Sequence, residues 1–382
     1  MEWETDYSLS YPRHIYFGWD SRQRLNDILA GAVNGLRSPR VFMVSTRSFH
    51  KDGGLDELDE LLGGCIVGHT AGIPHDPSLA AVDGLVDAIR RVEADTVVAV
   101  GGGSVMDAAK AAAAIAPIAG ASIVPYYNGE RDIVTPGLPF IALPTTAGTG
   151  AEITSNSVLT DPATLRKQSL RSPQMIACAA VVDPALTVTM PPRLTAESGL
   201  DALAQAIESY VSRRANAVSA ALACEAVHLL LTYLPAAYAD GTSCEARLKT
   251  AEGSLASAMA FSQSGLGAVH GLAHPIGVLL GLPHGLTCAI LLPHVMQWNM
   301  ASSRERFTTL AHTVNVGDAA DLVERVQEVC DELQVPDDFR QAGLREDHIP
   351  HIVANCRSNS MRSNPRPMSD DEVAEFVKKL LA

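Results

Sequence analysis

The chain has 382 residues, of which 47% are hydrophobic and 19% are charged, and its formal net charge is −14. This composition is that of a globular protein, and the length favours two domains or more. The acidic balance argues against nucleic acid and anionic membranes as partners, because both carry negative charge. The acidic N-terminal segment predicts no signal peptide, and no run of about 18 uninterrupted apolar residues predicts a membrane span. Seven dispersed cysteines fit a reducing cytoplasm and not a disulfide framework.

The first half of the chain alternates short apolar runs with helical patterns. Such alternation predicts a parallel sheet with helices on both faces. A further stretch, from Ser172 to Pro192, combines prolines with β-branched residues and indicates a buried strand and loop. The predicted strands cover 40–45, 65–69, 96–100 and 140–144, and the predicted helices cover 79–94 and 107–116.

After about Asp183 the strand patterns end and long helical patterns follow. The simplest interpretation is an α/β dinucleotide-binding domain over residues 1–184 and an all-helical domain over residues 185–382. No low-complexity linker separates them, so we expect close packing and a ligand site in the cleft between the domains. The predicted helices cover 195–212, 217–239, 243–262, 266–280, 303–314, 318–333 and 370–381.

A glycine-rich loop follows the strand predicted over 96–100. Glycines let the backbone approach a ligand closely, and the amides of a helix N-terminus bind anions. Ser104 and Asp107 have the spacing of a capping pair for the helix that follows. The segment does not match the G-x-G-x-x-G fingerprint, so a turn without a ligand is the alternative. The loop consists of Gly101, Gly102, Gly103 and Ser104.

A second loop of small residues, 144–150, leaves the strand predicted over 140–144 and includes Thr145 and Thr146. It also offers hydroxyls and backbone amides. Open α/β sheets bind nucleotides at the carboxyl ends of their strands. The two loops together therefore favour a dinucleotide site over ordinary turns.

Three histidines lie within fifteen residues of a mostly apolar segment: His270, His274 and His284. The first two are four apart and would share one helix face. The third follows Gly281 and Pro283, where a helix is expected to break, so that a loop would return it toward the others. Imidazoles are common ligands of divalent metals, and the cluster predicts a buried metal or catalytic site. The alternative is a set of core histidines bonded to backbone carbonyls.

Asp201 and Gln205 are four residues apart on a predicted amphipathic helix. The carboxylate of Asp201 would complete a metal site with His270 and His284. The alternative is an early-helix aspartate that is favoured by the helix dipole.

In order along the chain, five segments resemble the iron-containing (group III) alcohol dehydrogenase family. The resemblance implies the dehydroquinate synthase-like architecture of an α/β domain followed by a helical domain. It also implies a divalent metal (iron or zinc), NAD or NADP, a small alcohol or aldehyde substrate, and a homodimer or larger assembly. The segments are GGGSVMDAAK (101–110), PTTAGTGAEITSNSVLTD (144–161), GLDALAQAIESY (199–210), MAFSQSGLGAVHGLAHPIG (259–277) and LPHGLTCAILLPHVMQWN (282–299).

The resemblance also assigns roles to residues by position. It implies that His274 lies near the substrate and the nicotinamide, where it would relay the hydroxyl proton. It places Lys167 near the nicotinamide ribose. The implied metal ligands are Asp201, Gln205, His270 and His284; the implied nucleotide contacts are Gly101, Gly102, Gly103, Ser104, Asp107, Thr145 and Thr146.

The chain departs from the family pattern at two places. The family usually has histidine where this chain has Gln205, a neutral and harder ligand, so affinity for iron or zinc should fall. Related maleylacetate reductases work without the full ligand set, which leaves a metal-free site as an alternative. Thr46 follows the strand predicted over 40–45 where NAD-preferring members often carry an acidic residue. A 2′-phosphate is then not repelled, and Arg47 either pairs with it or points into water.

The main hypothesis is therefore a cytoplasmic NAD(P)-dependent alcohol dehydrogenase or aldehyde reductase, assisted by a divalent metal. A lyase that resembles dehydroquinate synthase and shows no net cofactor turnover is a second hypothesis. A nucleotide-binding protein that has lost catalysis through Gln205 is a third.

Overall fold

The computed structural model describes residues 3–32, 38–164 and 166–381, which divide into two compact units. The α/β unit consists of Tyr11–Thr146 and Gly150–Thr187. The helical unit consists of the chain from Val188 onward, the residues up to Ser10, and the short segment Ala147–Thr149. The two units are described separately below.

The described part of the α/β unit contains a six-stranded parallel sheet in the order β1-β8-β5-β4-β2-β3. A separate antiparallel hairpin is formed by β6 and β7. The strands are β1 (His14–Phe17), β2 (Val41–Ser45), β3 (Ile66–Ala71), β4 (Thr96–Gly101), β5 (Phe140–Pro144), β6 (Asn156–Asp161), β7 (Arg166–Arg171) and β8 (Ala179–Val182).

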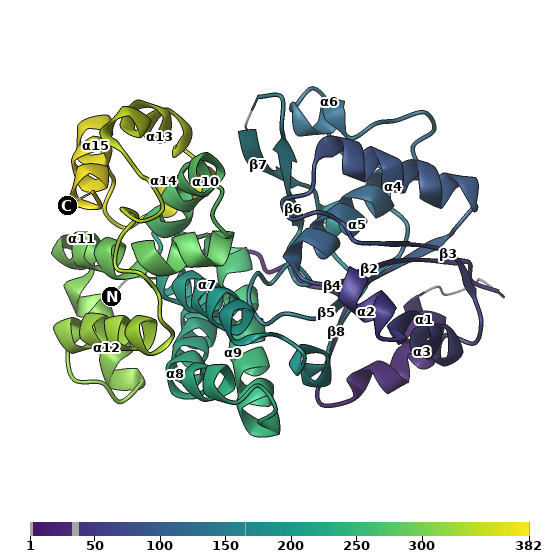
Figure 1. Ribbon diagram of the computed structural model, residues 1–382, viewed down its shortest axis with the longest axis horizontal. Coiled ribbons are helices and arrows are strands. Elements are labelled where there is room, and N and C mark those ends of the chain that lie inside the picture. The colour runs from purple at the N-terminus through teal and green to yellow at the C-terminus, as the bar shows by residue number, and fades with distance from the viewer. Residues whose placement is uncertain (1–2, 33–37, 165, 382) are drawn as a thin grey trace. The chain divides into compact units, whose positions relative to one another are not determined.

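Helices cover both faces of this sheet (Figure 1). Successive strand residues point to opposite faces of the sheet. Phe42 and Val97 lie on the face covered by α4 and α5. Met43 and Val98 lie on the opposite face, covered by α1 and α3. The central strands β2 and β4 are buried along their whole length, and most of their residues are apolar because both faces of the sheet are covered. The helices are η1 (Ser21–Arg24), α1 (Leu25–Ala32), α2 (Arg47–Lys51), α3 (Gly54–Leu61), α4 (Leu79–Arg91), α5 (Gly103–Ile115), α6 (Val124–Tyr127), η2 (Pro173–Met175) and η3 (Pro184–Thr187).

The helical unit has one large apolar core to which most of its helices contribute. Its most extensive packing joins α8 to α9 and α7, and α11 to α7. The helices are α7 (Pro192–Val211), α8 (Ala217–Ala239), α9 (Cys244–Ser264), α10 (Ala268–Leu280), α11 (His284–Thr313), α12 (Ala319–Glu332), η4 (Glu346–His348), α13 (Ile349–Asn355), α14 (Asn359–Ser363) and α15 (Asp370–Lys379).

Helix α8 is long and apolar enough to cross a membrane, with a mean hydropathy of 1.6, and it is the one such helix among the described residues. It packs against both α7 and α9, and half of its apolar window is buried inside the unit. Asn216 begins it with a capping box. These features are those of a core helix.

The predicted fold class is confirmed: a parallel sheet with helices on both faces is followed by a helical region. One helix is longer than predicted. Helix α11 is continuous over His284–Thr313 and contains Pro293, whereas the sequence predicted a helix over 303–314 only. The predicted helix break after Gly281 is confirmed: α10 ends at Leu280 and α11 begins at His284. The short turn between the two helices returns His284 toward His270, and their ring centroids are 5.5 Å apart.

Candidate active site

Four side chains of the helical unit bring potential metal-binding atoms together. Asp201 lies on α7, His270 on α10, and His284 and Cys288 on α11. One ligand atom from each lies within 4.8 Å of the others, and we call this group the donor cluster. Asp201 Oδ1 is 3.3 Å from His270 Nε2 and 3.8 Å from His284 Nε2, and Cys288 Sγ is 3.6 Å from His284 Nε2. Carboxylate, imidazole and thiol groups that converge in this way are typical ligands of divalent transition metals.

Gln205 lies one turn after Asp201 on α7, beside the donor cluster. Its Nε2 donates a hydrogen bond to Asp201 Oδ2 at 3.0 Å. Its Oε1 is buried and accepts no hydrogen bond from any residue that the structure describes. Leaving a buried acceptor unpaired costs about 1–3 kcal/mol, and a bound cation would remove that cost. The orphaned oxygen and the types of donor present therefore fit a divalent metal.

Glu208 orients the imidazole of His270. Glu208 Oε2 is 2.7 Å from His270 Nδ1, and Glu208 Oε1 accepts a hydrogen bond from the backbone amide of Val269 at 2.6 Å. The ring is thereby held with Nε2 toward Asp201, as in metal sites where a carboxylate supports a histidine ligand. The sequence analysis did not identify Glu208. Its position seven residues after Asp201, on the same helix face, was the available signal.

Two glycines allow α10 and α11 to approach α7 closely. A Cβ atom at Gly267 would lie 2.7 Å from Glu208 Oε1, and one at Gly285 would collide with the backbone carbonyl of Glu197. Larger residues at either position would push His270 or His284 away from Asp201. The geometry of the donor cluster therefore depends on these small residues.

The electrostatics of the donor cluster favour positive charge. Burial opposes charge on Asp201, but the hydrogen bond to His270 and the charges of both histidines outweigh burial and lower the pKa of the carboxyl. Burial also opposes charge on His270, yet its interaction with Cys288 and its hydrogen bonds to Asp201 and Glu208 raise its pKa well above the ordinary value. The two buried carboxylates thus create a place that attracts a cation.

The structure disagrees with the alternative interpretation that the sequence left open for each of two of these residues. Asp201 lies in the middle of α7 and not in its first turn, so the helix-dipole interpretation was wrong. Both ring nitrogens of His270 face carboxylates and not backbone carbonyls. His274 follows one turn later on α10, partly buried, with its ring centroid 5.3 Å from that of His284.

In the α/β unit, the glycine-rich loop joins β4 to α5. Gly101 ends the strand, Gly102 is the N-cap, and α5 begins at Gly103. A Cβ atom at Gly101 would lie 2.6 Å from the Cβ of Val105, so this turn requires glycine. The predicted capping pair was wrong: no side chain caps α5, because the helix begins before Ser104.

The second loop adjoins the first. The backbone amide of Thr145 donates to the carbonyl of Gly101 at 3.0 Å, and a Cβ atom at Gly102 would lie 3.2 Å from Thr146 Cγ2. Strands β4 and β5 are parallel neighbours, so their carboxyl ends present both loops at one edge of the sheet. The structure thus brings together the small-residue segments that the sequence identified.

A buried ion pair fastens α5 to the segment after the second loop. Asp107 Oδ2 accepts a hydrogen bond from the backbone amide of Val158 at 3.1 Å, and Asp107 Oδ1 is 3.5 Å from Lys110 Nζ. Lys110 Nζ donates to the carbonyls of Ala151 at 2.5 Å and Asn156 at 2.7 Å. The sequence analysis did not identify Lys110, a lysine inside an alanine-rich helix. The pair holds the loop against the helix.

Thr46 lies at the same sheet edge, because β2 pairs with β4. Its amide donates to the carbonyl of Val100, and its hydroxyl accepts from the amide of Phe49 as the N-cap of α2. The next residue, Arg47, is exposed, and its side chain lies against Gly72.

Lys167, on β7, is further along the chain. Its Nζ forms an ion pair with Asp76 Oδ1 at 2.6 Å, and the lysine side chain is mostly buried. The ion pair with Asp76 therefore restricts the position of the Lys167 amine.

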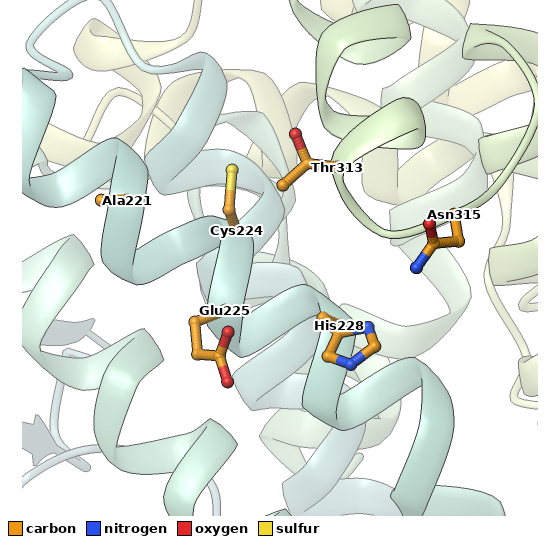
Figure 2. Close-up of a pocket in the computed structure, with 6 residues that line it drawn as sticks. All are labelled: Ala221, Cys224, Glu225, His228, Thr313 and Asn315. Carbon is orange, nitrogen blue, oxygen red and sulfur yellow. The ribbon is translucent and has the colours of Figure 1, made fainter.

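A separate pocket of about 430 Å³ lies in the helical unit, between α8 and the end of α11. Figure 2 shows the side chains of Cys224 and Thr313 facing this space. None of the donor cluster lines it. The lining residues are Ala221, Cys224, Glu225, His228, Thr313 and Asn315.

The parallel sheet with its glycine-rich loop and the all-helical region with its donor cluster define the class of two-unit, nucleotide-dependent dehydrogenases. Family models agree. The iron-containing alcohol dehydrogenase model matches residues 12–184, and the C-terminal model of the Fe-containing alcohol dehydrogenase family matches residues 195–381. The chain belongs to the iron-containing alcohol dehydrogenase family, and it is an oxidoreductase that acts on CH–OH groups with NAD.

Individual relatives are similar over most of their length. The chain is 34% identical over 315 residues to an NAD-dependent methanol dehydrogenase of Bacillus methanolicus, covering 80% of this chain and 82% of the relative. It is 33% identical over 341 residues to a 1,3-propanediol dehydrogenase of Klebsiella pneumoniae, covering 86% and 87%. The crystal structure of sulfoacetaldehyde reductase from Bifidobacterium kashiwanohense in complex with NAD+ superposes with a TM-score of 0.93 at 30% identity, covering 99% of this chain and 100% of that one.

Proposed function

We propose that this protein interconverts small alcohols and aldehydes with the help of a divalent metal, iron or zinc, held in the donor cluster. The observation that carries the proposal is the convergence of the donor atoms of Asp201, His270 and His284 beside the unpaired Oε1 of Gln205. When bound, the metal supplies Lewis acidity toward the substrate oxygen, and the nicotinamide supplies or accepts the hydride.

The protein's own groups prepare this chemistry. Glu208 holds His270 so that Nε2 faces Asp201 and does not rotate away. The burial of Asp201 and His270 excludes bulk water and strengthens the electrostatic interactions in the site. His274 is the proposed proton relay for the substrate hydroxyl, because an imidazole titrates near neutral pH and this one lies beside the ring of His284.

The α/β unit is proposed to hold the nucleotide at the edge formed by the carboxyl ends of β2, β4 and β5. The N-terminal amides of α5 and the hydroxyls of Ser104, Thr145 and Thr146 suit a pyrophosphate. Asp107 acts through Lys110 and the backbone of Val158, so we assign it to positioning the loop and not to direct contact with the cofactor. Lys167, steadied by Asp76, is proposed to contact the nicotinamide ribose.

We propose that the enzyme accepts NADP as well as NAD. The residue that follows β2 at the proposed cofactor edge is Thr46, which carries no charge to repel a 2′-phosphate. Arg47 is exposed beside it and offers a cation to that phosphate.

The substrate class follows from the relatives, whose names give methanol, 1,3-propanediol and sulfoacetaldehyde. We propose a small polar alcohol or aldehyde, a cytoplasmic location that suits the free cysteines, and a homodimer or larger assembly.

The structure favours this proposal over a metal-free reductase in which the Gln205 amide donates to the substrate oxygen. The NH₂ group of Gln205 already donates to Asp201, and the atom without a partner among the described residues is the acceptor Oε1. An acceptor attracts a cation and repels a substrate oxyanion.

The test is turnover by purified protein before and after chelation. Nicotinamide absorbance should change with a panel of small aldehydes and alcohols, fall after exhaustive removal of metal, and return on addition of Fe²⁺ or Zn²⁺. Full turnover by protein shown to contain no metal would overturn the metal assignment. Product formation without net oxidation or reduction of the cofactor would point to the lyase chemistry instead.

A further inference from the structure

Cys288 occupies a place in the donor cluster that no role assigned above explains. It is fully buried and lies one turn after His284 on α11, so the two side chains share a face of the helix. Its Sγ is 3.6 Å from His284 Nε2, the same atom that lies 3.8 Å from Asp201 Oδ1. The thiol thus faces the other donors and not the apolar core alone.

Three of the separations between these atoms are close to those of ligands around one cation. Oxygen or nitrogen ligands at about 2.0–2.1 Å and sulfur at about 2.3 Å, arranged tetrahedrally, lie about 3.3–3.6 Å from one another. The separation between His270 and Asp201 is 3.3 Å and that between Cys288 and His284 is 3.6 Å, both within this interval. The separation between His284 and Asp201, 3.8 Å, is slightly larger.

We propose that the thiolate of Cys288 is a metal ligand in this chain and serves as the fourth strong ligand, because Gln205 is only a weak one. The inference rests on the proposed metal function. As the metal–sulfur bond forms, the Sγ–H bond breaks and its proton passes to the solvent, because only the thiolate coordinates. The resulting strong ligands are Asp201, His270, His284 and Cys288.

Gln205 is the weaker donor for two reasons. Its amide oxygen is neutral and harder than either imidazole or thiolate. Its amide group is also already held by the hydrogen bond from Nε2 to Asp201 Oδ2. A sulfur ligand would therefore make this site softer than one built from oxygen and nitrogen alone, and would favour Zn²⁺ over Mn²⁺ or Mg²⁺.

The rival explanation is that Cys288 stays a thiol that donates a weak hydrogen bond to His284. X-ray absorption on wild-type protein loaded with one Zn²⁺ per chain separates the two. We expect one sulfur scatterer at about 2.3 Å, in addition to nitrogen and oxygen at about 2.0–2.1 Å. A first shell of nitrogen and oxygen only, at full zinc occupancy, would overturn the proposal.

Co²⁺-loaded protein provides a second measurement, because a thiolate ligand gives an intense sulfur-to-cobalt charge-transfer band in the near ultraviolet. The band should vanish in Cys288→Ala that still holds cobalt, and Zn²⁺ should bind this variant at least about tenfold more weakly. Cys356→Ala is the matched control: it removes an equally buried thiol of the same unit that lies outside the donor cluster, so the band should remain. Persistence of the band in Cys288→Ala would also overturn the proposal.

The outcomes distinguish this inference from the proposed function. Wild-type protein that binds a metal without sulfur coordination retains the proposed function and loses the role of Cys288. Wild-type protein that binds neither Zn²⁺ nor Co²⁺ contradicts both. If Cys288→Ala does not fold, the X-ray absorption spectrum of the zinc-loaded wild-type protein decides whether sulfur coordinates the metal.

Discussion

The helical unit and the α/β unit build their candidate sites from different parts of their residues. In the helical unit, side chains from α7, α10 and α11 converge, and the identity of each donor decides what binds. In the α/β unit, backbone amides and small residues at strand ends form the site, and Gly101 matters because it has no side chain. The first site should therefore fail when a donor is removed, and the second when an atom is added.

The largest effect is expected from removing a donor. His270→Ala should abolish metal binding and lower kcat/KM by about a thousandfold, because losing about 4 kcal/mol of Lewis-acid stabilisation has that consequence. Nucleotide binding, measured by the fluorescence of NADH, should remain largely intact. The same result is expected for His284→Ala.

The control is His312→Ala, which removes an exposed histidine from α11 and should change neither metal content nor turnover. Stoichiometric metal with full turnover in His270→Ala would show that the ligand assignment is wrong.

A buried acid in the α/β unit should make the stability of the protein depend on pH. Burial raises the pKa of Glu152 from 4.5 to about 7, although its own backbone amide and Lys110 act in the opposite direction. The folded state therefore keeps a proton that the unfolded chain releases above its lower pKa. This contribution is fully present below about pH 4.5 and is lost as the pH rises toward 7. The glutamine of Glu152→Gln does not titrate, so the variant does not lose this stability. The free energy of unfolding of the variant minus that of the wild type should therefore increase by about 2–3 kcal/mol between pH 5 and pH 8.

Urea denaturation of both proteins at pH 5 and pH 8 measures this difference. Glu60→Gln, which changes an exposed glutamate of the same unit, should show no comparable dependence. If the free energy of unfolding of Glu152→Gln minus that of the wild type decreased as the pH rose, the raised pKa of Glu152 would be contradicted.

Supporting residues should matter less than the donors they hold. Glu208→Ala leaves His270 Nδ1 and the amide of Val269 without their carboxylate partner. Metal affinity should fall by about tenfold to a hundredfold, the usual effect of losing such a partner. Competition with a chelator measures the affinity, and Glu208→Gln, which keeps an acceptor oxygen, should restore part of it. If both variants hold metal as tightly as the wild type, Glu208 does not position the ligand.

The pattern of apolar residues along the sequence was sufficient to predict the fold class, but not every helix and strand. The apolar runs that became β2, β4 and β5 are buried on both faces, which makes them conspicuous in the sequence. The hairpin strand β7, with the sequence RKQSLR, has no apolar run, because it lies outside the main sheet. Strand β7 pairs with its neighbour β6, so the hairpin is local, but a strand without alternating apolar residues gives no strand signal in the sequence.

The residues of the donor cluster were accessible to sequence reasoning to different degrees. Residue type and spacing indicated His270, His284 and Asp201, and the resemblance added Gln205 as a ligand. Cys288 was treated as one of several dispersed cysteines, because no helix was predicted over the first half of α11. Its position four residues after His284 was the available signal. Only the close approach of α10 and α11 to α7 brings these residues together.

Adding an atom to the glycine-rich loop tests the other half of the comparison. Gly101→Ala would place a Cβ atom 2.6 Å from Val105, which must shift the start of α5. NADH affinity should fall by about tenfold, equivalent to about 1.4 kcal/mol, while metal content stays unchanged. Gly31→Ala, on α1 with open space around it, is the control and should bind NADH normally. Loss of metal with unchanged NADH affinity in Gly101→Ala would contradict the division of labour between the units.

The smallest effect concerns the choice between NAD and NADP. Thr46→Asp would introduce a carboxylate at the end of β2 that accepts the ribose hydroxyls of NAD and repels the 2′-phosphate of NADP. The ratio of kcat/KM for NAD to that for NADP should rise by about tenfold, or about 1.4 kcal/mol of discrimination. Aspartate is also a good N-cap residue, so α2 should keep its capping interaction and the fold should be unaffected. Thr46→Asn is the matched neutral variant: it preserves the cap without the charge, and its ratio should stay near that of the wild type. An unmodified enzyme that already rejects NADP by several orders of magnitude would contradict the proposal, because it would show that something other than a carboxylate at this position excludes the phosphate.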